Sequence, residues 1–164
     1  MVLAPGAWGA TLAETARCLH SVAPVRGQMV AFGSIGLKHV VYGPRGYLVP
    51  RADSVTVAGS TMESVGFDAT TTAEGIARVK SAATEIAPAL SPAPIHSTWA
   101  GLRPVTPDML PLIGVDPENE RLVYACGHSR NGILLAPLTG EVVASLVAGT
   151  PVVHDLSQFR PERF

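Results

Sequence analysis

The sequence has few charged residues and almost no bias toward either sign. Only 15% of its 164 residues are Asp, Glu, Lys or Arg, and the formal net charge is −1, whereas an average soluble protein has about 25% charged residues. A surface that binds nucleic acid usually carries a strong basic excess, so we expect no nucleic-acid partner. Intrinsic disorder is also excluded, because 47% of the residues are hydrophobic and disorder requires low hydrophobicity.

Cysteines are few, and long apolar runs and a basic leader segment are lacking. Cys18 and Cys126 are the two cysteines, too few for a disulfide framework, which favours a reducing compartment. No apolar run reaches the roughly 18 residues of a transmembrane helix. The first residues lack the basic segment that opens a signal peptide. These absences predict a cytoplasmic protein with no membrane partner.

The motifs of several common sites are missing. The five histidines and two cysteines are scattered, whereas zinc needs three or four converging ligands, so no metal site is expected. Ser129 beside His128 lacks the G-x-S-x-G frame of a nucleophile elbow. Neither G-x-G-x-x-G nor a P-loop occurs. No site for a dinucleotide pyrophosphate is therefore expected from the sequence.

What the sequence does contain is a series of short apolar runs separated by glycine, proline and small polar residues. Val2–Ala4 predicts a short buried strand, and Thr11–Leu19 predicts a modest helix. Four β-type runs then predict an antiparallel meander; they are Val25–Phe32, Lys38–Gly43, Gly46–Arg51 and Ser54–Thr61.

A well-defined helix and a second group of strands follow the meander. Thr71-Thr72-Ala73-Glu74 fits a capping box, and apolar residues at helical spacing follow until Pro88. Further strands are predicted at 96–102, 110–115 and 121–127, and a last helix at 133–148 with Gly149 at its C′ position. This order of elements indicates an α+β fold.

Four arginines occupy strand ends and turns: Arg45, Arg51, Arg103 and Arg130. Arg103 follows a predicted strand that contains Trp99, and a buried guanidinium is costly unless an anion meets it. Its fork of donors matches a carboxylate. The carboxylate of a bound substrate would satisfy this requirement. A structural ion pair with an acidic residue of the chain, for instance Asp108, would satisfy it equally, so both interpretations stay open.

The segment Gly127–Leu134 joins a predicted strand to the last helix. The free N–H groups and the positive dipole end of that helix would favour an anion or an electron-rich ring edge. Asn131 has a second interpretation, as a simple N-cap residue. The segment is thus a candidate binding loop.

Six segments together resemble the C-terminal part of FAD-dependent amino-acid oxidases of the D-amino acid oxidase superfamily, and most of all the glycine oxidases of thiamine biosynthesis. The resemblance extends over nearly the whole chain, and these segments carry it: LAPGAW, PVRGQMV, GYLVPR, VAGSTMESVGFD, WAGLRPVTPDMLPLIG and GHSRNGILLAPLTG. The resemblance implies a late strand and helix of the FAD-binding domain at 1–22, an antiparallel-sheet substrate domain with one covering helix at 23–104, and a return to the FAD/NAD(P)-binding α/β domain at 105–164.

The resemblance also implies roles for individual residues. Arg103 would clamp the substrate carboxylate, Tyr47 would assist it through its hydroxyl, Met62 would limit the substrate side chain, and Arg130 would also reach the substrate. The pyrimidine end of the flavin would lie against His128, Ser129, Arg130, Asn131, Gly132, Ile133 and Leu134, while Gly6 and Trp8 would lie at the edge of the FAD-binding domain. No catalytic group beyond those that position the substrate is implied.

The activity implied is oxidation of a small amino acid by FAD and dioxygen, giving an imine, then an oxo acid and ammonia, with hydrogen peroxide. Positioning the substrate suffices, because the flavin carries the difficult step. The resemblance implies a Rossmann half with a G-x-G-x-x-G turn that this chain lacks, so the chain is expected to act as part of a larger, homo-oligomeric protein. The alternatives are an enzyme similar to sarcosine oxidase or D-amino acid dehydrogenase, and a non-catalytic interaction or oligomerisation module.

Overall fold

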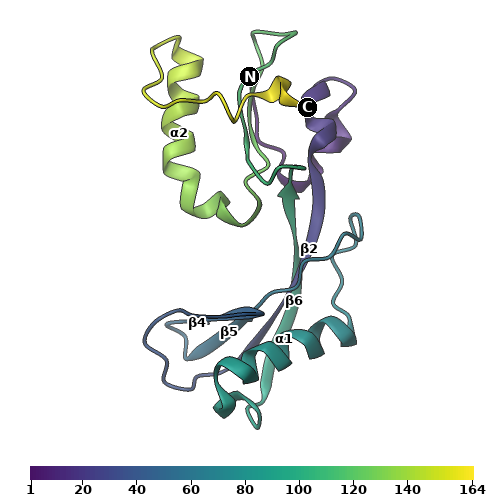
Figure 1. The fold of residues 1–164 in the computed structure, drawn as a ribbon, viewed down its shortest axis with the longest axis vertical. Helices are drawn as coiled ribbons and strands as arrows, with labels where there is room; N and C mark the ends of the chain where they lie inside the picture. The colour runs from purple at the N-terminus through teal and green to yellow at the C-terminus, as the bar shows by residue number, and fades with distance from the viewer. The chain divides into compact units, whose positions relative to one another are not determined.

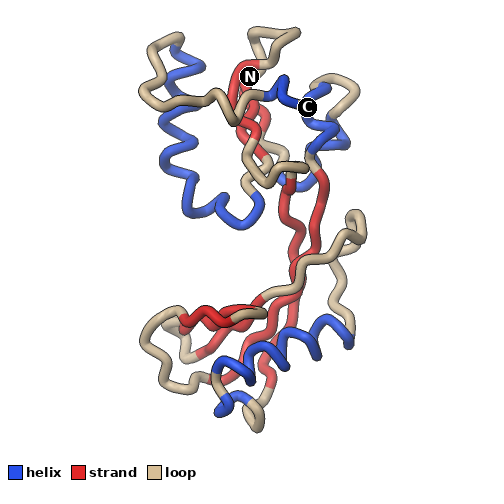
Figure 2. Tube along the Cα trace, in the orientation of Figure 1, coloured by secondary structure: helices blue, strands red, loops and turns tan.

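The computed structural model describes residues 1–164 and divides into two units whose boundary falls inside two strands, β2 (Ala23–Gly33) and β6 (Ile95–Val105). Unit 1 comprises Met1–Val25 and Arg103–Phe164, and unit 2 comprises Arg26–Leu102. Figure 1 shows the ribbon, and Figure 2 shows the helices, strands and loops along the chain. Arg103, expected just after the end of its strand, lies inside β6 instead.

Unit 2 is built on a five-stranded sheet with the order β3-β4-β5-β2-β6. The strands β3 (Val41–Gly43), β4 (Gly46–Pro50) and β5 (Val55–Gly59) pair antiparallel in sequence, and β5 pairs antiparallel with β2. The predicted meander is therefore confirmed for its last three strands, whereas its first run, β2, pairs with β5 and not with β3, the next strand in sequence. The helix α1 (Ala73–Ile86) and the short 3-10 helix η3 (Pro88–Leu90) follow.

Helix α1 covers one face of this sheet (Figure 1). Side chains alternate along the strands, so one face supplies the core. The buried cluster between helix and sheet consists of Val30, Phe32, Leu48, Ala58, Val79, Ala83 and Leu90. The opposite face of the sheet carries the other half of the alternation.

The start of α1 uses a cap that differs from the predicted one. Thr72 is the N-cap residue, and its Oγ1 accepts a hydrogen bond from the Gly75 backbone N–H at 3.1 Å. The reciprocal acceptor is not Glu74: the Thr72 backbone N–H donates to Oε1 of Gln28, at 2.8 Å. A residue from strand β2 thus completes the capping arrangement that the sequence pattern assigned to a local carboxylate.

Unit 1 contains a three-stranded mixed sheet with the order β1-β8-β7. β1 (Val2–Leu3) runs parallel to β8 (Val123–Cys126), and β7 (Leu112–Val115) runs antiparallel to it. Together with helix α2 (Gly132–Ala148) this arrangement agrees with the α+β fold class. β1 lies at an edge of the sheet, and Val2 is exposed rather than buried.

The predicted helix at 11–19 is wrong. Two 3-10 helices stand there instead, η1 (Gly6–Leu12) and η2 (Arg17–Ser21). The hydroxyls of Thr11 and Thr15 donate to the carbonyls of Trp8 and Leu12, three residues earlier, and such local bonds compete with the α-helical ladder. The threonine hydroxyls therefore favour 3-10 turns over the α-helix that the spacing of apolar residues predicted.

Helix α2 ends as predicted, with Gly149 in the left-handed conformation at φ +67°. Its sides are largely uncovered within this chain: Ile133 is 92% exposed, Leu134 78% and Val147 61%. By length and composition the stretch Ser129–Ala148 could cross a membrane, and only 6% of it is buried. The expectation of no such segment was therefore too strict, although these two properties do not distinguish a span from a helix that other protein covers.

Candidate functional site

The loop between β8 and α2 has a backbone that its sequence specifies closely. Gly127 has φ +76°, and a Cβ there would lie 2.9 Å from Cγ2 of Thr106, so a larger residue would be strained and crowded. Ser129 also has positive φ, +50°, at the start of the 3-10 helix η4 (Ser129–Asn131). The chain thereby turns sharply into the first residues of α2. Asn131 occupies the N-cap position but makes no side-chain cap bond, so capping does not account for it.

This loop holds an unused polar group. The Ser129 Oγ atom is buried and has no hydrogen-bond partner within the chain. Buried polar atoms in proteins are nearly always paired, and an exception calls for a reason. Backbone conformations of low population also concentrate at ligand sites. The Ser129 hydroxyl is therefore a polar group of this loop that the rest of the chain leaves unsatisfied.

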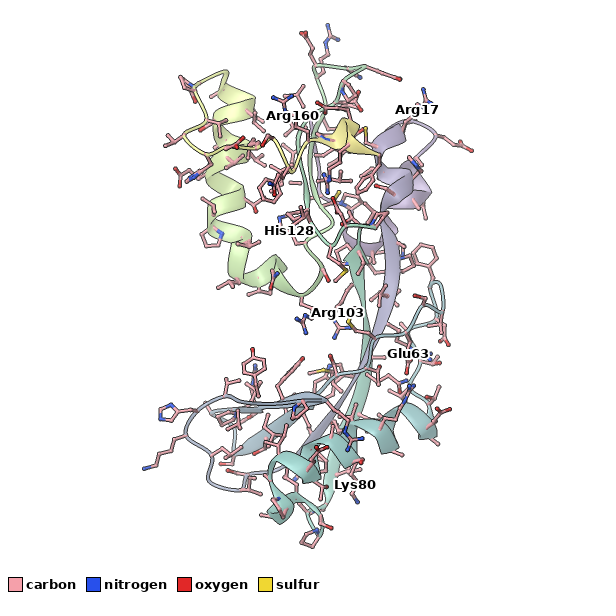
Figure 3. All side chains as sticks on the ribbon, in the orientation of Figure 1. Arg17, Glu63, Lys80, Arg103, His128 and Arg160 are labelled. Carbon is pink, nitrogen blue, oxygen red and sulfur yellow. The ribbon has the colours of Figure 1, made fainter.

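His128 connects the loop to its surroundings. Its Nε2 atom forms a hydrogen bond of 3.0 Å with Oγ1 of Thr139 in α2. Burial lowers the pKa of His128 below its ordinary value, because desolvation disfavours the charged ring. A backbone bridge also pairs His128 with Val105 of β6. Arg103, two residues before Val105, therefore enters the same region of unit 1 (Figure 3).

A hollow of about 310 Å³ lies along this loop. It brings together six residues that the sequence analysis singled out, joined by Ala4 and Pro104: Gly6, His128, Ser129, Arg130, Gly132 and Ile133. Trp8, Asn131 and Leu134 do not line it. Cys126, which carried no signal in the sequence, does line it, but burial raises its pKa to about 12, so its thiol stays protonated.

Asp108, the structural partner suggested for Arg103, is held by another arginine. Nε of Arg163 lies 2.7 Å from Oδ2 of Asp108, and Nη2 lies 3.2 Å from Oδ1. The Thr106 hydroxyl and the Leu110 backbone N–H donate to the same carboxylate. Asp108 therefore has an arginine partner other than Arg103, and the structural ion pair suggested for Arg103 stays a prediction.

The Asp108–Arg163 pair predicts a pH dependence of stability. The hydrogen bond from Arg163 lowers the pKa of Asp108 to about 2. A carboxyl with a lowered pKa stabilises the fold above its unfolded value of about 4, and this contribution is lost as the pH falls toward 2. We expect Asp108→Asn to be less stable than the parent chain at pH 7 and to lose less on acidification between pH values of about 4 and 2. Urea unfolding across this range measures it, and parallel curves for the two proteins would contradict it.

Tyr47 and Met62, the other two expected substrate residues, belong to unit 2. Tyr47 lies in β4, half-buried, with its hydroxyl donating to Sδ of Met29 at 3.7 Å. Its partner position in β5 is Gly59, where a Cβ would lie 2.8 Å from the Tyr47 hydroxyl. Met62 lies past the end of β5 and is 51% exposed. The two side chains line separate hollows, so unit 2 does not by itself bring them into one cavity.

A buried polar cluster that the sequence analysis missed fixes the segment carrying Met62. Glu63, the next residue, accepts hydrogen bonds from Nε of Arg26 at 2.7 Å and from Nε2 of Gln28 at 2.9 Å, and pairs with Arg78 at 2.5 Å. Arg26 and Glu63 also exchange both backbone hydrogen bonds. One sequence feature could have indicated this cluster: the polar residues Arg26 and Gln28 interrupt the otherwise apolar run Val25–Phe32.

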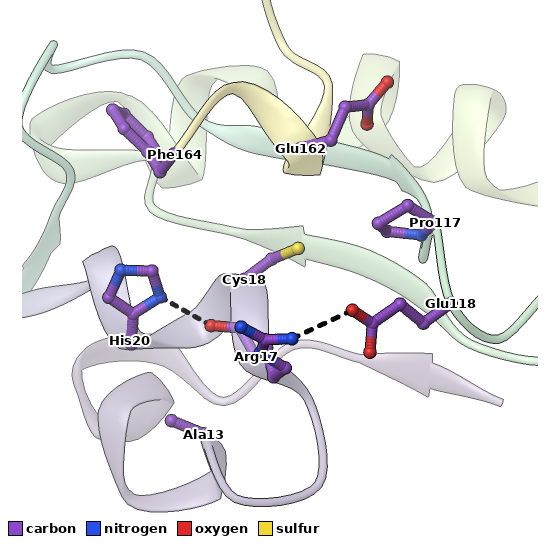
Figure 4. Close-up of a pocket in the computed structure, with 8 residues that line it drawn as sticks. All are labelled: Ala13, Arg17, Cys18, His20, Pro117, Glu118, Glu162 and Phe164. Atoms are coloured by element: carbon purple, nitrogen blue, oxygen red, sulfur yellow. Dashed lines mark hydrogen bonds and ion pairs between the residues drawn. The ribbon is translucent and has the colours of Figure 1, made fainter.

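Another hollow, of about 460 Å³, lies elsewhere in unit 1 and contains none of the expected site residues. Its charged groups largely satisfy one another: Arg17 pairs with Glu118 at 3.1 Å, and the His20 ring bonds to the Arg17 carbonyl (Figure 4). No three His, Cys, Asp or Glu side chains converge to hold a metal ion. This hollow is therefore a weaker candidate for the functional site than the loop between β8 and α2.

Several known proteins are similar to this chain in sequence and fold. The FAD dependent oxidoreductase family matches residues 1–146. The chain is 38% identical to the glycine oxidase of Pseudomonas putida, covering 99% of this chain and 45% of that protein. It is also 38% identical to the bifunctional protein ThiO/ThiG of Synechocystis sp., over 99% of this chain and 25% of that protein. The crystal structure of glycine oxidase from Geobacillus kaustophilus superposes with a TM-score of 0.91 at 36% identity, over 99% of this chain and 45% of that one.

These matches confirm the resemblance drawn from the six segments. The chain spans less than half the length of the glycine oxidases that it matches. The family match covers both units, since it begins in the first strand and ends within α2. The chain belongs to the FAD dependent oxidoreductase family.

Proposed function

We propose that this chain forms the substrate-binding part of an FAD-dependent oxidase of small amino acids, similar to glycine oxidase. The observation that carries the proposal is the Gly127–Gly132 loop, with its buried, unpaired Ser129 hydroxyl next to the strand that bears Arg103. The family is FAD-dependent, and the relatives of similar sequence carry the name glycine oxidase. No metal or acid–base pair is needed for this role.

The residues of the loop are suited to the polar edge of a flavin. Ser129 Oγ has no partner in the chain, and the first N–H groups of α2 have no acceptor within the helix. Arg130 is exposed and stands at the positive end of the helix dipole, which adds to the attraction for an anionic ring edge. FAD bound there would supply the electron acceptor for the dehydrogenation.

The other proposed residues hold the amino acid. The Arg103 guanidinium would bind the substrate carboxylate through paired hydrogen bonds, Tyr47 would add its hydroxyl, and Met62 would restrict the substituent on the α-carbon. The amino acid would lose two electrons and two protons to become an imine. Water would hydrolyse this imine to an oxo acid and ammonia, while dioxygen would be reduced to hydrogen peroxide.

The test is peroxide formation from glycine by the chain together with the part of Pseudomonas putida glycine oxidase that it does not cover. We expect peroxide only when both parts and FAD are present, because the chain has no G-x-G-x-x-G anchor. Peroxide from the chain and FAD alone would contradict the need for a complementary part. Assembly of the two parts with FAD but without glycine turnover would favour the non-catalytic module.

The exposed apolar residues of α2 predict how the chain behaves without that part. Large exposed apolar patches mark surfaces that other protein covers, so we expect the isolated chain to self-associate. Leu138→Gln with Val147→Gln should shift it toward monomer in sedimentation velocity, since these residues are 44% and 61% exposed. Tyr42→Gln, which removes a 78% exposed ring from unit 2, is the control and should change nothing. A monomeric parent chain would refute this expectation.

A further inference from the structure

Helix α2 is interrupted close to its start by a proline. Pro137 lies inside the helix, and it has no N–H group to donate to the carbonyl of Ile133, four residues earlier. Sharp changes of direction in helices arise at proline, and Figure 1 shows α2 changing direction near its beginning. The first turn of α2 directly follows the loop between β8 and α2. It is therefore joined to the rest of the helix by fewer backbone hydrogen bonds than an ordinary turn.

A side-chain hydrogen bond links the two sides of this interruption. Nε2 of His128, which precedes the helix, lies 3.0 Å from Oγ1 of Thr139, two residues after Pro137. Both side chains are half-buried, and a hydrogen bond is stronger in such surroundings than in water. The His128–Thr139 bond therefore connects the loop to the part of α2 that lies beyond the proline.

The backbone of His128 is held as well. It pairs with Val105 of β6 in an isolated antiparallel bridge, and its carbonyl accepts a hydrogen bond of 2.9 Å from the Asn131 backbone N–H. The strand thus fixes the backbone of His128, while helix α2 fixes its ring. His128 is therefore the residue through which β6 and α2 both act on the loop.

The two residues beside His128 have left-handed backbone conformations. Gly127 has φ +76° and Ser129 has φ +50°. A residue other than glycine rarely adopts this conformation, and it persists where surrounding contacts determine it. The Ser129 Oγ atom makes no hydrogen bond within the chain, so its own side chain does not hold this residue. The anchored ring of His128, the adjacent residue, is the side chain suited to do so.

We propose that Thr139 is a positioning residue, which holds the Gly127–Gly132 loop in its flavin-binding conformation by fixing the ring of His128. This inference rests on the proposed function, which supplies the flavin as the ligand of the loop. His128 lines the hollow along the loop, whereas Thr139 does not. Thr139 therefore acts through His128, and the groups that face the flavin are those of the loop itself.

The first measurement follows hydrogen–deuterium exchange of the 164-residue chain by mass spectrometry, without FAD. Thr139→Val replaces the hydroxyl by a methyl group, and Thr139→Ser keeps the hydroxyl. We expect Thr139→Val to raise the exchange of amides in residues 127–132 about tenfold, the effect of one lost hydrogen bond. Exchange in strands β7 and β8 should stay unchanged. Thr139→Ser should exchange like the parent chain.

The second measurement is the dissociation constant of FAD from the complemented protein, followed by flavin fluorescence. We expect Thr139→Val to weaken FAD binding about tenfold and Thr139→Ser to bind FAD like the parent. Thr150→Val is the matched control, because the Thr150 hydroxyl donates to the Ser145 carbonyl near the other end of α2. This control should leave both the exchange of the loop and the affinity for FAD unchanged.

A double-mutant cycle decides whether Thr139 acts through His128. In a His128→Ala background, Thr139→Val should cause no further loss of FAD affinity, because the bond that it removes is already absent. An equal loss in both backgrounds would overturn the proposal, since Thr139 would then stabilise α2 without holding the loop. Exchange and FAD affinity of Thr139→Val that match the parent, or failure of Thr139→Ser to retain them, would overturn it as well.

The same measurements separate this inference from the proposed function. If the complemented protein forms no peroxide with glycine, while Thr139→Val weakens FAD binding only where His128 is present, the oxidase function fails and the positioning role stands. If glycine is oxidised and Thr139→Val changes neither the exchange of the loop nor the affinity for FAD, the oxidase function stands and the positioning role does not.

Discussion

Replacing Arg103 by Ala is expected to lower kcat/KM for glycine in the complemented protein by about a hundredfold or more. The proposed clamp makes two charge-assisted hydrogen bonds to the substrate carboxylate, and each is worth about 1.5–3 kcal/mol. Arg103 is half-buried in β6, so water substitutes poorly for the lost guanidinium. Steady-state peroxide assays over a wide range of glycine concentrations measure the effect.

Arg103→Lys refines this prediction. Lysine keeps the charge but loses the planar fork, so we expect an intermediate rise in KM with a smaller change in kcat. Arg17→Ala is the matched control, because the Arg17 side chain is 79% exposed and its pair with Glu118 contributes little to stability. Arg103→Ala with glycine kinetics equal to those of Arg17→Ala would show that Arg103 does not hold the carboxylate.

Local patterns in the sequence predicted the elements well where neighbouring residues determine them. The hairpins of β3, β4 and β5 depend on alternation and turn residues, and α1 depends on helical spacing ended by Pro88; both formed near the expected bounds. The pairing of β2 with β5 is not local, and the sequence did not predict it. The end of α2 at Gly149 is equally local, since only glycine adopts positive φ without strain.

Contacts between residues distant in the sequence explain what was missed. Gln28 caps α1 from 44 positions away, and Arg163 takes the carboxylate of Asp108 from 55 positions away. Neither partner carries a pattern that identifies it, because any arginine or glutamine would look the same in sequence. The unpaired Ser129 hydroxyl is likewise visible only once the fold shows that nothing in the chain reaches it.

Replacing Glu63 by Ala is expected to destabilise unit 2 more than any other single carboxylate substitution. The Glu63 side chain is only 10% exposed and accepts hydrogen bonds from Arg26, Gln28 and Arg78. Its removal leaves the buried Arg26 guanidinium with one remaining carboxylate, Asp68, at 2.6 Å. Breaking a buried ion pair from one side costs about 3–5 kcal/mol, a large share of the stability of a small domain. Urea unfolding at pH 7 measures this loss.

The pH dependence of the free energy of unfolding provides a second test of the role of Glu63. Burial alone would raise the pKa of Glu63, but hydrogen bonds from Gln28 and Arg26 outweigh it and the pKa is lowered. The resulting stabilisation is present above the unfolded value of about 4.3 and is lost as the pH falls through the lower folded value. Glu63→Gln, which keeps the shape without the charge, should therefore lose less stability than the parent chain over this range.

The control for Glu63 is Glu85→Ala, because Glu85 is 45% exposed and its partner Arg45 is 60% exposed. Exposed pairs contribute about 0–1 kcal/mol, so this variant should unfold close to the parent chain. In the complemented protein, Glu63→Gln should also relax the exclusion of alanine relative to glycine, because Met62 is held in place by its neighbour. If Glu63→Ala and Glu85→Ala unfold alike, the buried cluster does not anchor this segment, and Met62 must be positioned by contacts from outside it.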